Sequence, residues 1–86
     1  MVYVADIVVT LKKSILDPQG DAVRSALKSM GYYGVKDVRI GKRIEVRLEA
    51  AGEAECRKTV DEMCAKLLAN TVVEAYDFSI REAPRG

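Results

Sequence analysis

Four consecutive residues, Asp17-Pro18-Gln19-Gly20, have the composition of a ligand-binding loop and lie where a strand ends and a helix begins. Backbone N–H groups at the start of a helix can hold an anion, so a phosphate or carboxylate site is one hypothesis for this turn. The other hypothesis is structural, since Asp17 is a preferred N-cap residue and Pro18 a preferred first helical residue. The residue types favour the structural role, in which Asp17 accepts hydrogen bonds from the first N–H groups of the helix.

A second group of residues with possible chemistry is basic. Arg39, Lys42 and Arg43 surround the predicted turn between the second and third strands, and Arg47 follows them. Guanidinium and ammonium groups bind phosphates and acidic partners, so this group could hold either. Glu45 alternates with these cations along the chain, which favours an ordinary face of mixed charge.

The remaining reactive side chains predict no catalytic site of the chain's own. Histidine, the commonest general base and metal ligand, is absent. Cys56 and Cys64 fall on one predicted helix, about 12 Å apart along its axis, which is too far for a disulfide. They lack the spacing of a redox or zinc motif, so we expect small buried hydrophobic residues. Asp6, on the first strand, is expected to face solvent.

Length and composition predict one small globular domain, residues 1–82, with a flexible C-terminal tail at 83–86. The chain has 86 residues, of which 49% are hydrophobic and 31% charged, and its formal net charge is +1. A domain of this size buries only about 60–65% of the surface of its unfolded chain, so oligomerisation or docking on a larger partner is expected. The charge balance argues against a nucleic-acid or membrane binder. With no apolar run of about 20 residues and no signal peptide at the N-terminus, a cytoplasmic location is expected.

Hydrophobic periodicity predicts the element order strand, helix, strand, strand, helix, strand. The strands are predicted at residues 2–11, 35–40 and 43–50 and around 76–80, and the helices from Pro18 to about residue 30 and from about Gly52 to about residue 70. We therefore expect an α+β two-layer βαββαβ sandwich, in which both helices cover one face of a mostly antiparallel sheet. The buried stripe of the second helix is predicted to contain Val60, Met63, Cys64, Leu67 and Leu68.

Two features of the predicted strands lead to further predictions. A three-residue connection, Gly41 to Arg43, would pair Ile40 with Ile44 and keep the apolar residues of both strands on one face. The first strand is apolar on much of both faces, so its second face is expected to contact something, such as another subunit. One strand could therefore pair across a subunit boundary.

Three phrases, read in order, carry a resemblance to a known family: TLKKSILDPQG at 10–20, DVRIGKRIEV at 37–46 and CAKLLANTVVEAYDFSI at 64–80. Over nearly its whole length the chain resembles PurS, the small subunit of phosphoribosylformylglycinamidine (FGAM) synthase in purine biosynthesis. Thr71 departs from the family pattern, which typically has proline at this place. The loop that enters the last strand is therefore expected to be less rigid here.

The resemblance implies a subunit without catalytic residues in an ATP-dependent carbon–nitrogen ligase complex. In such a complex a glutaminase subunit releases ammonia, and a large synthetase subunit uses ATP to convert formylglycinamide ribonucleotide to formylglycinamidine ribonucleotide. The small subunit joins the other two, supports ammonia transfer and forms dimers or dimers of dimers. By this resemblance the chain itself binds no cofactor, whereas the complex uses ATP, magnesium and glutamine. The residues then expected at partner contacts are Asp17, Pro18, Gly20, Arg39, Lys42 and Arg43.

Three other classes of protein compete with this expectation. A regulatory domain of ACT type, binding a small molecule near Asp17 at a dimer interface, stays open. An acylphosphatase-type enzyme needs an arginine and an asparagine at an anion loop, but the single asparagine, Asn70, ends a predicted helix. An RNA-recognition domain needs aromatic residues on its third strand, and residues 43–49 contain none.

Overall fold

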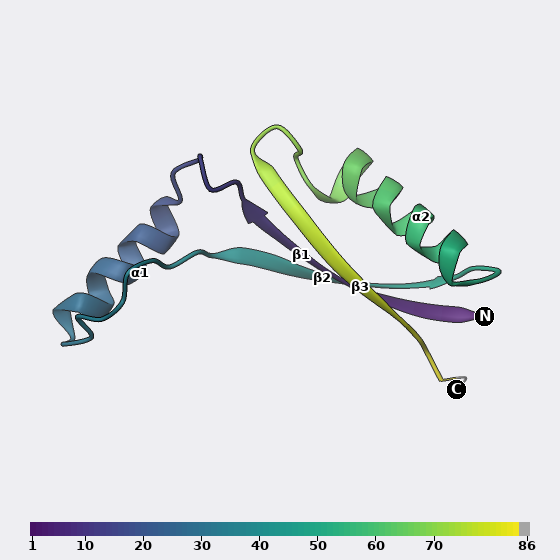
Figure 1. Ribbon diagram of the computed structural model, residues 1–86, viewed down its shortest axis with the longest axis horizontal. Coiled ribbons are helices and arrows are strands. Elements are labelled where there is room, and N and C mark those ends of the chain that lie inside the picture. The colour runs from purple at the N-terminus through teal and green to yellow at the C-terminus, as the bar shows by residue number, and fades with distance from the viewer. Residues whose placement is uncertain (85–86) are drawn as a thin grey trace.

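The computed structural model describes residues 1–84 and contains a three-stranded antiparallel sheet and two helices (Figure 1). In chain order the elements are β1 (Val2–Leu11), α1 (Pro18–Ser29), β2 (Gly41–Glu49), α2 (Glu53–Met63), a π-helical turn η1 (Cys64–Leu68) and β3 (Glu74–Glu82). β1 is the central strand and pairs with both β2 and β3. The predicted α+β class is confirmed.

The hydrophobic core lies between one face of the sheet and α2. β1 contributes the buried side chains of Tyr3, Ala5, Ile7 and Val9, which alternate along the strand and so share one face. From the helical side the core receives Cys56, Val60, Cys64 and Ala69. Both cysteines are free and fully buried, as their spacing predicted.

The prediction of four strands was wrong, because residues 35–40 form no strand within the chain. The expected turn, Gly41 to Arg43, lies inside β2, where Gly41 pairs with Thr10 and Lys42 with Val9. The Ile40 N–H donates to the Asp17 carboxylate at 2.8 Å, which holds this segment at the start of α1. The chain therefore enters β2 directly instead of reversing.

The prediction that both helices cover one face of the sheet was also wrong, because only α2 does so. α1 and the return segment after it project from one end of the sheet (Figure 1); we call residues 18–40 the arm. The radius of gyration is 16.6 Å, whereas a compact domain of this length has about 12 Å. The apolar side of α1 is consequently open, and Met30 is 70% exposed.

Local sequence signals set both ends of α1 as predicted. Asp17 is the N-cap and Pro18 the first helical residue. Gly31 follows the helix with φ +99°, a left-handed conformation that favours glycine. The Tyr32 N–H donates to the Leu27 carbonyl at 3.0 Å, which is the capping pattern of a Schellman motif.

The end of the second helix differs from the predicted periodicity. The Ala69 N–H donates to the Cys64 carbonyl, an i to i+5 bond that widens the last turn into a π-helix. This change of period rotates Leu67 out of the predicted stripe, and its side chain is 82% exposed. The assignment of Leu67 to the core was therefore wrong, whereas Val60 and Cys64 are buried.

The chain keeps ordered contacts up to Ala83. Its N–H donates to the Val2 carbonyl at 2.8 Å and its side chain is buried. Of the tail predicted at 83–86, residues 85 and 86 lie outside the described residues, and the domain boundary stays a prediction. Within residues 1–84, neither helix has the length and apolar character that crossing a membrane requires.

Candidate functional site

The Asp17-Pro18-Gln19-Gly20 turn lies at the base of the arm, where the arm joins the sheet. The Asp17 carboxylate is buried and accepts hydrogen bonds from the Gly20 N–H at 2.9 Å and from the Ile40 N–H at 2.8 Å. One side chain thus holds the start of α1 and the chain that enters β2. We call these two bonds the Asp17 clasp.

The clasp keeps Asp17 ionised. The Gly20 N–H and then the Ile40 N–H lower the pKa of the Asp17 carboxyl below its usual value, and the charge of Arg39 acts in the same direction. Arg39 is fixed beside it, because its guanidinium donates to the Leu11 carbonyl at 2.8 Å. Since a carboxylate already occupies the N–H groups at the start of α1, the cap role predicted for Asp17 is confirmed.

This pKa shift predicts a pH-dependent contribution of Asp17 to stability. Because its pKa is lower in the folded state, the ionised carboxylate stabilises the fold above its unfolded pKa of about 3.9, and the contribution is lost as the pH falls through the folded pKa. We expect the free energy of unfolding in urea to fall more steeply between pH 6 and pH 3 in the wild type than in Asp17→Asn. Asp21→Asn, on the exposed first turn of α1, controls for the loss of a surface charge. An equal pH dependence of the unfolding free energy in the wild type and in Asp17→Asn would contradict the lowered pKa of Asp17.

Two glycines permit close backbone approaches at the same junction. A Cβ atom on Gly20 would lie 2.1 Å from the Val38 carbonyl oxygen, and one on Gly41 would lie 2.3 Å from the Val9 carbonyl oxygen. Real Cβ atoms do not come this close to a backbone oxygen. Gly20 therefore lets the return segment lie against α1, and Gly41 lets β2 begin against β1.

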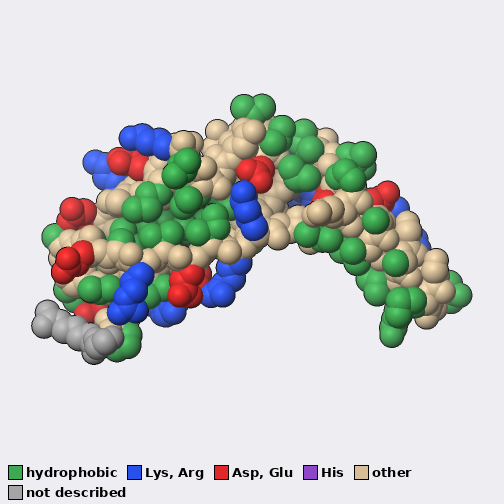
Figure 2. All heavy atoms as spheres, turned by 180° about the vertical axis from the view of Figure 1, so that it is seen from behind, with side chains coloured by type: hydrophobic (Ala, Val, Ile, Leu, Met, Phe, Trp, Pro, Cys, Tyr) green, Lys and Arg blue, Asp and Glu red, His purple; other side chains and the backbone are tan. Residues whose placement is uncertain are grey.

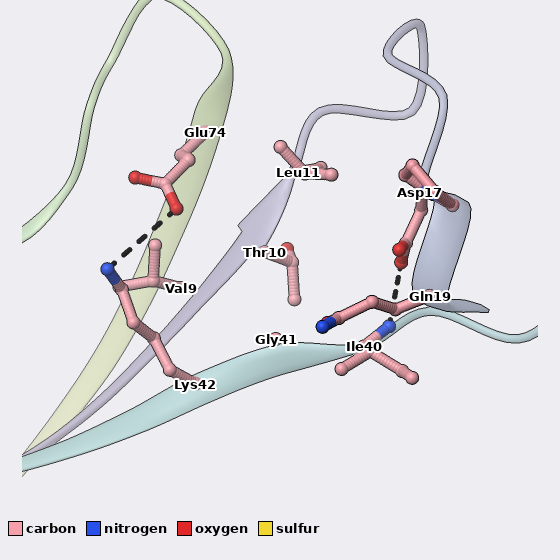
Figure 3. Close-up of a pocket in the computed structure, with 10 residues that line it drawn as sticks. Val9, Thr10, Leu11, Asp17, Gln19, Ile40, Gly41, Lys42 and Glu74 are labelled. Atoms are coloured by element: carbon pink, nitrogen blue, oxygen red, sulfur yellow. Dashed lines mark hydrogen bonds and ion pairs between the residues drawn. The ribbon is translucent and has the colours of Figure 1, made fainter.

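A pocket of about 370 Å³ opens between the clasp and the sheet (Figure 3). Val9 and Ile40 give it an apolar lining, and Gln19 contributes an amide. On the sheet side Lys42 and Glu74 form an ion pair at 3.9 Å. A pair this long contributes little to stability, so the exposed Lys42 ammonium remains available to a partner.

The predicted basic group does not form one patch. Arg39 faces the Leu11 carbonyl, and Lys42 faces Glu74. Arg43, the next residue in β2, points to the opposite face of the sheet and pairs with Asp6. The structure therefore brings Arg39 near Asp17 and separates Arg43 from both.

Asp6 is ion-paired on the face of the sheet that α2 does not cover. Its two carboxylate oxygens contact the guanidinium groups of Arg43 and Arg81, one from each neighbouring strand. Sequence reasoning missed Arg81, because it is 75 residues from Asp6 and only the β1–β3 register brings them together. Val8 lies on the same open face and is 48% exposed.

The remaining ionisable side chains of the core tie elements together or are held in their neutral forms. The hydroxyl of Tyr76 donates to Asp61 at 2.7 Å, a bond that raises the pKa of Tyr76 and ties β3 to α2. Burial raises the pKa of both the Cys56 and the Cys64 thiols, which disfavours the nucleophilic thiolate form. Within residues 1–84, no three histidine, cysteine, aspartate or glutamate side chains are grouped as a metal site would need.

The chain matches a known protein family. The profile of the family described as PurS, phosphoribosylformylglycinamidine (FGAM) synthase, matches residues 4–82. The PurS subunit from Synechocystis is 55% identical over 78 residues, which are 91% of this chain and 78% of that protein.

Solved structures share the fold as well as the sequence. A crystal structure of Bacillus subtilis PurS is 50% identical, superposes with a TM-score of 0.81, and the match covers 93% of this chain and 99% of that one. A chain in the structure of PurLQS from Thermotoga maritima is 28% identical with a TM-score of 0.86, over 94% of this chain and 99% of that one.

Proposed function

This chain belongs to the PurS family of FGAM synthase subunits, and from that premise we propose that it is the small subunit of such a complex in purine biosynthesis. It joins a glutaminase subunit to a synthetase subunit and carries none of their chemistry. The observation that carries this proposal is the match of both sequence and fold over nearly the whole chain. The similar chain from the PurLQS structure supports assembly with the other subunits.

The arrangement of the chain suits an assembly subunit. The arm and the open face of the sheet present large surfaces, while the buried reactive groups lie in the core or in the Asp17 clasp. ATP, magnesium and glutamine are used by the complex, and this chain binds none of them. The occupied start of α1 supports this part of the proposal, since it leaves no free N–H cradle for a phosphate. The complex is cytoplasmic, and copies of the chain associate with one another.

The six residues predicted at partner contacts divide into two sets. Asp17, Gly20 and Arg39 bind other parts of the chain and shape the arm. Pro18, Lys42 and Arg43 are exposed, so direct contacts with other chains are proposed for these three.

Reconstitution tests the proposed function. The synthetase and glutaminase subunits are assayed with ATP and formylglycinamide ribonucleotide, with and without this chain, using either glutamine or free ammonia as the nitrogen source. We expect activity with glutamine to require the chain and activity with ammonia to be independent of it. If neither activity depends on the chain, the proposal fails. A thermal-shift screen with amino acids and nucleotides would then test the alternative of a ligand-sensing domain that uses the pocket beside Asp17.

A further inference from the structure

The arm and the sheet meet at a charged junction that also contains a pocket. Figure 2 shows hydrophobic side chains gathered on the body of the molecule and again on the projecting arm, with charged side chains where the two parts meet. The pocket of about 370 Å³ beside the Asp17 clasp opens at this junction. Its volume falls in the range of small-molecule sites, about 300–1,000 Å³.

The floor of the pocket is apolar. Val9 is 1% exposed, and Leu11 and Ile40 are half-buried beside it. Val9 and Leu11 lie two residues apart on β1, so they share the face of the sheet that holds the core. Figure 3 shows the Gln19 side chain extending from the start of α1 toward Gly41, which closes the pocket on the side of the arm. The pocket can therefore take an aliphatic group of a few carbon atoms.

The sheet side of the pocket carries two opposite charges that are positioned but not hydrogen-bonded to each other. Lys42 pairs with Val9 and Glu74 with Leu11, so both charges lie on the face of the pocket floor. Glu74 is fixed, because its Oε1 accepts a hydrogen bond from the Asn70 N–H at 2.7 Å. Its Oε2 lies 3.9 Å from Lys42 Nζ, longer than the roughly 2.7–2.9 Å of a charge-assisted hydrogen bond. An acceptor oxygen and an ammonium group thus remain available to a ligand.

We propose that this pocket binds a free α-amino acid with an aliphatic side chain. The ligand carboxylate accepts from Lys42 Nζ, the ligand ammonium donates to Glu74 Oε2, and the aliphatic side chain lies on the apolar floor. A simple anion would be repelled by Glu74 and a simple cation by Lys42, whereas a zwitterion satisfies both charges. Asp17 does not compete for the ammonium, since its carboxylate already accepts two backbone N–H groups.

The inference goes beyond the proposed function and does not rest on it. A bound amino acid would contact β2 through Lys42, β3 through Glu74 and α1 through Gln19. Binding would therefore hold the arm against the sheet. The Ile40 N–H, which donates to Asp17 at this junction, should exchange its hydrogen more slowly when the pocket is filled.

Titration of the purified full-length chain with L-leucine tests the proposal. We expect the melting temperature to rise with L-leucine concentration and the NMR signals of the Gly41 and Lys42 amides to shift. Leucinamide lacks the carboxylate and isocaproate lacks the ammonium, so each should bind at least about tenfold more weakly. Equal binding of all three would show a site for apolar groups alone and would overturn the proposal. So would the absence of any effect of L-leucine, L-isoleucine or L-valine up to about 10 mM.

Two variants test where the amino acid binds. Glu74→Gln keeps an acceptor for the Asn70 N–H but removes the charge, and Lys42→Gln removes the ammonium. Each should weaken L-leucine binding at least about tenfold and abolish the slower exchange of the Ile40 N–H.

Glu45→Gln is the matched control, because Glu45 lies on the opposite face of β2 and its side chain is 57% exposed. Its affinity for L-leucine should equal that of the wild type. Wild-type affinity in Glu74→Gln or in Lys42→Gln would overturn the assignment. Because every measurement uses this chain alone, such a failure is distinguishable from a failure of the reconstitution assay.

Discussion

Replacing Gly20 with alanine should lower the free energy of unfolding by about 1–3 kcal/mol, the usual range for forcing extra atoms into a packed site. The added Cβ would lie 2.1 Å from the Val38 carbonyl oxygen, so the return segment must move away from α1. This movement would lengthen the bond between the Ile40 N–H and Asp17, because Ile40 follows two residues later. Urea unfolding measures the loss of stability, and hydrogen exchange of the Ile40 N–H measures the opening of the clasp.

Because Gly20 lies in α1, its replacement by alanine also has a stabilising effect that opposes the clash. Alanine is better than glycine inside a helix by about 1 kcal/mol, so a net loss of stability reports the clash. Gly34→Ala is the matched control, since its Cβ would meet nothing within 4 Å. We expect its stability to stay within about 0.5 kcal/mol of the wild type. A Gly20→Ala variant as stable as Gly34→Ala would show that the return segment is not packed against α1.

Val9→Ala is expected to destabilise the fold by about 2–3 kcal/mol, from the lost burial of two carbon atoms and the cavity left behind. Val9 is 1% exposed and lies in the core beneath α2. The adjacent Val8 points to the opposite face and is 48% exposed, so Val8→Ala makes the same chemical change in open surroundings. Denaturant unfolding at one fixed protein concentration compares the two, because association of copies would otherwise contribute to stability.

The test depends on the difference between the losses of unfolding free energy in Val9→Ala and in Val8→Ala. Equal losses at Val8 and Val9 would mean that both faces of β1 are buried in solution, which would place another chain on the open face. A small loss at Val9 would contradict the position of the core.

The parts of the fold that depend on neighbouring residues were predictable from the sequence. Asp17, Pro18 and Gly31 set the ends of α1 through bonds within a few residues. The apolar run of β1 and the alternation along β3 marked these two segments as strands. Residues 35–40 show why such reasoning fails elsewhere. Their alternation is that of a strand, but a strand forms only beside a partner, and within residues 1–84 no strand lies beside residues 35–40.

The assignment of Leu67 to the core was wrong for a different reason. Helical periodicity assumes a constant number of residues per turn, and one i to i+5 bond at Ala69 changes that number. No residue type in this stretch signals the wider turn, so the error could not be detected from the sequence.

Only the local contacts of the candidate site could be predicted from the sequence. The cap formed by Asp17 follows from its position before Pro18, but its bond to Ile40 spans 23 residues. The basic residues near the predicted turn were identified correctly by type, but their grouping assumed a hairpin. Once Gly41 to Arg43 become part of a strand, adjacent side chains point to opposite faces, and the group divides.

The central position of β1 also has a consequence for folding during synthesis. β1 carries half of the buried core residues and is synthesised before both of its neighbours, and its register with β3 pairs Tyr3 with Glu82. The core can therefore close only after β3 has been synthesised. Until then the apolar strand β1 stays open to chaperones and to other nascent chains. Contacts between residues so distant in sequence also make folding slow compared with a helical domain of the same length.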